Sequence, residues 1–164
     1  MLNHGLSRVL KITLLAVGDR MPTWIDQGFF EYQKRIVRPF RLSLVQIPAL
    51  RRPKGADMAR IRQQEESRIL NSVPDSACLI ALDKRGLNRT TKQVAQNMKN
   101  WLDQREPVAL AIGGPEGFSE EFIGMCSEVW SLSNLTFPHG LARVIVAEQL
   151  YRGYSILQGL PYHR

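Results

Sequence analysis

SLSNLTFPHGLARVIVAEQLYRGYSILQGLPYHR, residues 131–164, is the stretch of this chain that decides how it folds. Over residues 141–157 apolar side chains cover most of the circumference of a helix, whereas a surface helix keeps a broad polar face. Its few polar groups are chiefly Arg143, Glu148, Gln149 and Arg152. We therefore expect a helix buried in a core or against another copy of the chain. Buried charges are costly unless paired or used, so this end of the chain is also expected to carry function.

Length and composition favour one well-packed domain. The 164 residues suit a single core, and an apolar content of 44% argues against disorder. No apolar run approaches the roughly 20 residues that a membrane span needs, and residues 1–11 lack the apolar segment of a secretory signal. Cys78 and Cys126 lie far apart without metal-ligand spacing, so we expect reduced core cysteines in a cytoplasmic protein without a metal.

The net charge of +7 is confined to one part of the chain. Residues 1–60 hold 11 Lys and Arg against 4 Asp and Glu, whereas residues 61–164 hold 11 of each sign. Localised positive charge favours a polyanionic partner, most plausibly nucleic acid, although a solvated basic face is the alternative. The basic loop PALRRPK, residues 48–54, is the segment expected to touch RNA, unless its charge serves only solubility.

Apolar runs and helical spacing alternate along the chain about five times. The expected strands cover residues 10–17, 41–47, 77–82, 107–112 and 129–132, with a turn at Gly86. The first expected helix starts near Thr23. The others cover 57–70, 90–102 with Thr90 or Thr91 as its cap, a short segment capped by Ser119, and 141–157. Thr23 or Asp19 is expected to cap the first helix, and Trp24, Trp101 and Trp130 are expected in the core. This alternation predicts an α/β domain with a mostly parallel sheet and helices on both faces.

Three segments follow three of the buried strands, namely Leu82–Asp83, Ile112–Gly117 and Leu132–Phe137. Ligands of such sheets bind outside the carboxyl ends of the strands, so these segments are expected to line one crevice. The sequence IGGPEG lacks the spacing of a phosphate loop, and an ordinary tight turn is its alternative interpretation. The third segment carries no acid, base or metal ligand, which suits a weakly polar aromatic group such as adenine. Its alternative is a helix-entry loop with Thr136 as the cap.

Three motifs closely resemble a known family. AIGGPEGF, WSLSNLTFPHGLARVIVAEQLYRGYSI and the terminal PYHR are similar to the ribosomal RNA large subunit methyltransferase H family. These small SPOUT-class enzymes methylate N3 of a pseudouridine in 23S rRNA. The resemblance covers residues 10–164 as a single SPOUT methyltransferase domain and leaves residues 1–9 as an extra leader. It implies an α/β knot with a C-terminal trefoil, a homodimer, S-adenosylmethionine as cofactor, and the ribosome as partner.

The resemblance also implies site residues. The implied cofactor-binding residues are Leu82, Gly113, Leu132, Ser133, Asn134, Leu135, Thr136 and Phe137. The expected catalytic tail is Tyr162, His163 and Arg164, with His163 as the base that removes a proton from the target, and with Tyr162 stacking and Arg164 holding phosphate.

Other roles remain open at this stage. His139 and Glu148 are further candidate bases, and Arg143 and Arg152 are candidates for holding substrate phosphate. Alternatively, Glu148 and Arg152, four residues apart, form a structural pair. Because the sulfonium of the donor already activates the methyl group, neither a metal nor a nucleophilic side chain is required. The alternative to an enzyme is a non-catalytic ribosome-binding factor with the same fold.

Overall fold

The computed structural model describes residues 8–163, and its centre is a sheet of five parallel strands. The strands are β1 (Leu10–Val17), β2 (Phe40–Ile47), β3 (Cys78–Asn88), β4 (Val108–Ile112) and β5 (Glu128–Ser131). Their order across the sheet is β2-β1-β4-β3-β5. All five residues of the central β4 are buried, as expected for a parallel sheet covered on both faces.

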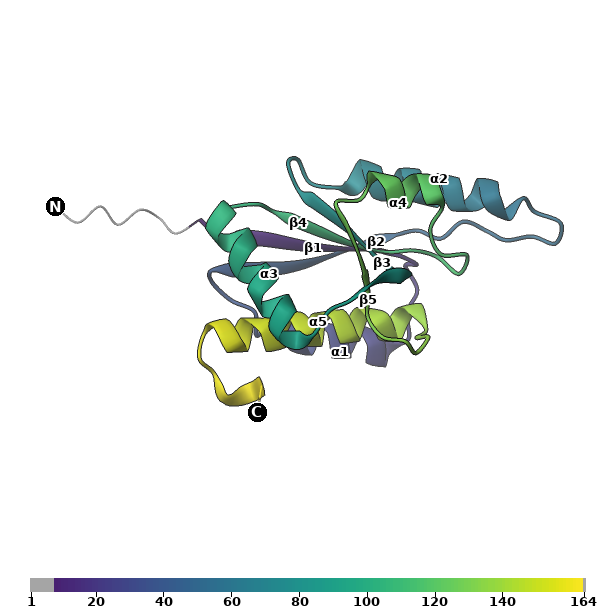
Figure 1. Cartoon of the computed structure of the whole chain (residues 1–164). Coiled ribbons are helices and arrows are strands. Elements are labelled where there is room, and N and C mark those ends of the chain that lie inside the picture. The colour runs from purple at the N-terminus through teal and green to yellow at the C-terminus, as the bar shows by residue number, and fades with distance from the viewer. Residues whose placement is uncertain (1–7, 164) are drawn as a thin grey trace.

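Five α-helices cover the sheet. They are α1 (Thr23–Gln33), α2 (Met58–Ser72), α3 (Thr91–Gln104), α4 (Glu120–Met125) and α5 (His139–Leu157), and a short 3-10 helix, η1 (Pro161–His163), follows them. Figure 1 shows α2 and α4 over one face of the sheet and α1, α3 and α5 over the other. Each face has its own hydrophobic core. The predicted α/β class with helices on both faces is therefore confirmed, while the implied C-terminal trefoil knot stays a prediction.

The strand β3 differs from its predicted bounds, because it continues to Asn88 instead of ending at Leu82. Leu82 and Leu87 both pair with Trp130 of β5, so the residues between them form a bulge. A Cβ atom on Gly86 would lie 2.6 Å from the backbone of Trp130, so only glycine fits this close approach. The turn predicted at Gly86 is thus a bulge within a strand.

The helix caps confirm part of the sequence prediction. Thr90 caps α3 in a capping box with Gln93, and the Ser119 hydroxyl accepts a hydrogen bond from the backbone N–H of Phe122 in α4. The caps expected for α1 were wrong, since Pro22 occupies that position without a side-chain bond. In the same way Pro138 precedes α5, so Thr136 is not its cap. At both sites the proline carbonyl accepts the first helical hydrogen bond.

The helix α5 lies between α1 and α3, and none of its residues is exposed to solvent. Its apolar residues Ala142, Val146, Leu150 and Tyr154 belong to the core beneath the sheet. The predicted burial of this helix is confirmed, and within one chain the neighbouring helices and the sheet provide it. Trp101 and Trp130 are also core residues and stack at 5.9 Å, but Trp24 is 58% exposed, so its predicted burial was wrong.

The two cysteines are free thiols that are partly buried. Burial raises the pKa of the Cys126 thiol to about 11, and its Sγ lies 3.3 Å from the carbonyl oxygen of Phe122. At pH 8 we expect iodoacetamide to alkylate Cys126 in the folded protein about 100-fold more slowly than in the unfolded chain, because the thiolate is the reacting form. Mass spectrometry of the peptide that contains Cys126 measures this rate. Equal rates in native protein and in denaturant would contradict this prediction.

Candidate functional site

The carboxyl ends of three adjacent strands form one edge of the sheet. Leu82 in β3 pairs with Ile112 in β4 on one side and with Trp130 in β5 on the other. Gly113 therefore follows directly after one neighbour of Leu82, and Leu132 lies two residues beyond the other. The sheet thus places the three predicted segments next to one another, at the edge where α/β sheets bind ligands.

A cavity of about 70 Å³ lies at this edge, between the sheet, α3 and α5. Its lining residues are Leu82, Arg89, Val94, Leu110, Trp130, Ser131, Leu132, Ile145, Val146, Gln149 and Leu150. Of the eight predicted cofactor residues, Leu82 and Leu132 line this cavity, whereas Gly113 and residues 133–137 lie outside its walls. The mainly apolar lining with a few polar groups fits a flat, weakly polar ring.

The loop at residues 132–137 extends from the mouth of the cavity. Asn134, Leu135 and Thr136 are exposed, and Leu135 is 73% exposed. The Ser133 hydroxyl accepts a hydrogen bond from the backbone N–H of Leu135 at 3.0 Å, and the Asn88 amide donates to Asn134 at 2.9 Å. The loop is therefore tied to the end of β3 on one side while its tip faces solvent.

The cavity is small for a nucleoside. An apolar cavity of about 150 Å³ binds benzene, and this one has about half that volume. Binding of an adenine-sized ring therefore requires the mouth to widen. A Cβ atom on Gly113 would lie 3.1 Å from the Phe118 ring and 3.3 Å from the Gly117 carbonyl oxygen, so a larger residue at this position would need one of these neighbours to move.

Arg89 was not among the predicted site residues, and Gln149 was named only as a polar group of the last helix, but both lie in the cavity wall. Arg89 bonds to Glu128 at 2.9 Å and lies over the Trp130 ring at 5.8 Å, and the Trp130 indole N–H donates to the same carboxylate at 2.6 Å. Gln149 accepts a hydrogen bond from the Thr91 hydroxyl at 2.8 Å. Their roles depend on contacts between separate elements, so no local spacing pattern could have revealed them.

The C-terminal tail folds back onto α5. The Tyr162 hydroxyl donates to Glu148 at 3.1 Å, its ring lies 4.6 Å from the Tyr151 ring, and the Arg152 guanidinium lies 4.9 Å from it. Burial and the Glu148 carboxylate raise the pKa of Tyr162 above its usual range, so this phenol stays protonated and does not act as a base. His163 is exposed, and Arg164 lies outside the described residues.

The tail and the cavity lie on different sides of α5. In Figure 1 the tail hangs beneath α5, away from the sheet, whereas the cavity lies between α5 and the sheet. Glu148 stands between them, since one oxygen accepts from Arg152 at 2.6 Å and from Tyr162, and the other accepts from Gln149 of the cavity wall at 2.7 Å. These bonds favour a structural role for Glu148 and Arg152. The predicted tail residues and the predicted cofactor residues are not brought together within one protomer.

The other two candidates, His139 and Arg143, lie near the ends of β1 and β2. Burial and the nearby charge of Arg143 lower the pKa of His139, so its imidazole is neutral at pH 7. Arg143 is fully buried and donates to the carbonyl oxygens of Gly18 at 2.6 Å and Val17 at 3.2 Å. Because its guanidinium does not reach the surface, the structure gives no support to a contact with substrate phosphate.

Within residues 8–163, no group of three or more His, Cys, Asp or Glu residues could hold a metal ion. None of the described helices is both long enough and apolar enough to cross a membrane.

Comparisons with known proteins agree with this fold. The family described as "Predicted SPOUT methyltransferase" matches residues 10–163. The structure resembles a probable methyltransferase from Bordetella pertussis (TM-score 0.56, 14% identity, 88% of this chain and 94% of that one). It also resembles a putative methylase family protein from Neisseria gonorrhoeae (TM-score 0.52, 13% identity, 88% of this chain and 82% of that one). At such low identity these two structures support the fold alone, and the family match defines the class, a SPOUT methyltransferase.

Curated relatives narrow the class to one family. Ribosomal RNA large subunit methyltransferase H from Coxiella burnetii is 46% identical over 155 residues, which cover 94% of this chain and 100% of the relative. The protein of the same name from Thioalkalivibrio sulfidiphilus is 43% identical over 155 residues, which cover 94% of this chain and 99% of the relative. The chain belongs to the ribosomal RNA large subunit methyltransferase H family. It is accordingly an enzyme that uses S-adenosylmethionine, whose adenine ring fits the character of the apolar cavity.

Proposed function

We propose that this protein transfers a methyl group from S-adenosylmethionine to N3 of a pseudouridine in 23S rRNA on the assembled ribosome, in the cytoplasm. The observation that carries this proposal is the identity of 43–46% to methyltransferases of this name over nearly the whole chain. The experiment is incubation with undermethylated ribosomes and labelled cofactor, followed by mapping of the modified nucleotide. Label at any nucleotide other than a pseudouridine of 23S rRNA would contradict the proposal.

The cofactor would be held at the sheet edge. When bound, S-adenosylmethionine supplies a methyl group that its sulfonium has already activated. We assign Leu82, Gly113 and residues 132–137 to holding it, with apolar walls for the adenine ring and backbone groups for its polar atoms. Holding the reacting groups in line can lower the barrier by roughly 7–11 kcal/mol.

The remaining chemical task is removal of the proton from N3 of the target base. A positioned base typically contributes about 10²–10⁴-fold in rate. His163 is our candidate, because its side chain is exposed and a ring nitrogen of neutral imidazole can accept a proton, whereas the Tyr162 phenol stays protonated. Tyr162 and Arg152 would orient the tail through their contacts with Glu148, and Arg164 would contact phosphate.

We further propose that the active form is a homodimer in which the tail of one subunit serves the cavity of its partner. The tail lies on the side of α5 away from the cavity of its own chain. The neighbouring helix α1 exposes Trp24 and Phe30, each at 58%, and such exposed apolar side chains mark interaction surfaces. Together these observations support a partner subunit on this side of the molecule.

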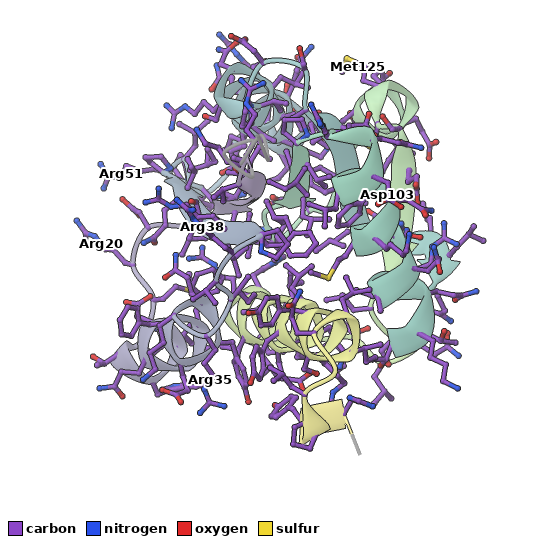
Figure 2. The ribbon with its side chains drawn as sticks, turned by 90° about the vertical axis from the view of Figure 1, so that its left-hand side faces the viewer. Arg20, Arg35, Arg38, Arg51, Asp103 and Met125 are labelled. Atoms are coloured by element: carbon purple, nitrogen blue, oxygen red, sulfur yellow. The ribbon has the colours of Figure 1, made fainter. Side chains whose placement is uncertain are left out.

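The rRNA would contact the basic first third of the chain. Figure 2 shows Arg20, Arg38 and Arg51 on one side of the molecule, and all three are exposed, as is Lys54. Arg52 differs from its neighbours, because ion pairs to Glu65 and Glu116 occupy its side chain. The basic loop at residues 48–54 thus offers Arg51 and Lys54 to phosphate, but not Arg52.

Replacing Arg51 and Lys54 together by glutamine is expected to weaken ribosome binding and to reduce its dependence on salt. Each phosphate contact releases condensed counterions, and its loss lowers the slope of log K against log salt by about 0.7–0.9. Filter binding to ribosomes at several salt concentrations measures both effects. The control is Lys92→Gln, which removes one positive charge at an exposed position of α3, outside the basic loop. It measures the effect of losing one charge at a site away from this loop. An unchanged slope in the double variant would exclude this loop from the RNA-binding face.

A further inference from the structure

The Arg52 side chain is fully engaged by the protein itself. Its Nε and Nη2 donate to the Glu116 carboxylate at 2.9 and 2.7 Å, and its Nη1 and Nη2 donate to the Glu65 carboxylate at 3.0 Å each. Nη1 also donates to the Leu50 carbonyl at 2.8 Å. These five contacts match the five N–H donors of a guanidinium, so Arg52 is held in one orientation between two carboxylates.

The two carboxylates belong to different parts of the fold. Glu65 lies on α2 with a side chain only 3% exposed, and it also accepts the backbone N–H of Leu50 at 2.9 Å. Glu116 lies in the turn Gly113–Gly117, directly after β4. Arg52 therefore connects the basic loop both to the body of the protein and to the turn at the proposed cofactor site.

The turn at residues 113–117 is shaped around this ion-pair cluster. A Cβ atom on Gly114 would lie 2.7 Å from Glu65 Oε2 and 2.9 Å from Arg52 Nη2, so the backbone passes directly over the charges. One hydrogen bond from the Gly117 N–H to the Gly114 carbonyl, at 3.0 Å, closes the turn. A turn that is mostly glycine and proline has few side chains to make other contacts. The two hydrogen bonds from Arg52 to Glu116 therefore contribute much of what holds this turn in one conformation.

The charge states of the cluster agree with this geometry. Hydrogen bonds from Arg52 hold the pKa of Glu116 below its usual value. A carboxylate with a lowered pKa stabilises the fold above its ordinary pKa near 4.5, and this contribution is lost as the pH falls below that value. The Arg52–Glu116 pair is therefore fully charged at neutral pH. Since the Glu65 carboxyl group is buried, loss of Arg52 alone would leave it without its ion-pair partner.

We propose that Arg52 is a positioning residue that couples rRNA binding at the basic loop to cofactor affinity at the Gly113–Gly117 turn. This inference rests on the proposed function and extends it to a link between the two substrates. Arg51 and Lys54 flank Arg52 and face solvent, so phosphate bound to them restrains the same loop that holds Glu116. A more ordered turn binds the cofactor more tightly, and by linkage the bound cofactor strengthens rRNA binding equally.

The test measures binding of S-adenosylhomocysteine, which cannot react, by calorimetry with and without undermethylated ribosomes. In the wild type we expect ribosomes to raise the affinity at least fivefold, within the usual range of coupling between sites. The variant Arg52→Gln/Glu65→Gln removes the pair without leaving a buried charge, and we expect about tenfold weaker binding and no effect of ribosomes. In turnover its KM for S-adenosylmethionine should rise while kcat changes little.

Two comparisons make the outcome decisive. Arg51→Gln, on the same loop but outside the cluster, should keep the wild-type affinity measured without ribosomes. Glu116→Gln, which leaves the Arg52–Glu65 pair in place, should reproduce the loss seen in the double variant. Wild-type affinity and wild-type coupling in both cluster variants would overturn this inference and leave the proposed function intact. A wild type that binds no S-adenosylhomocysteine would overturn the proposed function as well.

Discussion

Replacing Gly113 by valine is expected to weaken S-adenosylmethionine binding at least 100-fold. A Cβ atom at this position already lies 3.1 Å from the Phe118 ring and 3.3 Å from the Gly117 carbonyl oxygen, so the two further carbons of valine would press on both. The turn after β4 would have to shift, and the backbone groups that we assign to the cofactor would shift with it. Calorimetry with the purified protein measures the loss, and turnover on ribosomes should disappear with it.

The matched control for this substitution is Gly124→Val. Gly124 is an exposed residue of α4 whose added Cβ would meet nothing within 4 Å, so this variant should bind the cofactor as the wild type does. Because valine at 113 also presses on a buried ring, thermal unfolding of both variants separates loss of the site from loss of the fold. A folded Gly113→Val protein with normal affinity would place the cofactor elsewhere.

Removing residues 162–164 is expected to lower the rate of methyl transfer at least 100-fold while cofactor affinity changes less than about twofold. A missing base costs about 10²–10⁴-fold in rate. The described part of the tail packs against the outer side of α5, and the residues that line the cavity remain in place. Single-turnover rates with saturating cofactor and ribosomes measure the chemical step, and gel filtration monitors the assembly state.

Point variants then identify the group responsible. His163→Asn should reproduce most of the loss, and Tyr162→Phe should lose less, because the ring keeps its contact with Tyr151 and gives up only the bond to Glu148. His139→Asn, at the start of α5, tests the competing base. Full activity of the truncated protein would exclude the tail from the chemistry, and a loss confined to His139→Asn would move the base there.

The spacing of apolar residues predicted most of the secondary structure. The reason is that the side of a strand or helix that is buried depends on the residues of that same element. The runs at 10–17 and 107–112 became β1 and β4 within one residue at each end. A cap at Thr90 or Thr91 was also predicted, and the structure selects Thr90, which accepts a hydrogen bond from the backbone N–H of Gln93 three residues later. Two predictions were wrong for different reasons. The residue before α1 is Pro22, which makes no side-chain cap bond. The strand β3 continues past Leu82 because a bulge lets it pair further with β5.

The sequence by itself determined the alternation of strands and helices, the burial of the last helix, and, through its long C-terminal motif, the family. Only the tertiary structure decided which charged side chains are bonded within the protein and which face solvent. Arg52 meets Glu116 across 64 positions of the chain, and Arg143 meets Gly18 across 125. It also set the tail on the side of α5 opposite to the cavity. The physical reason is that ion pairs and cavities are formed by residues from separate helices, strands and loops. The spacing of residues along the chain indicates only the contacts within one such element.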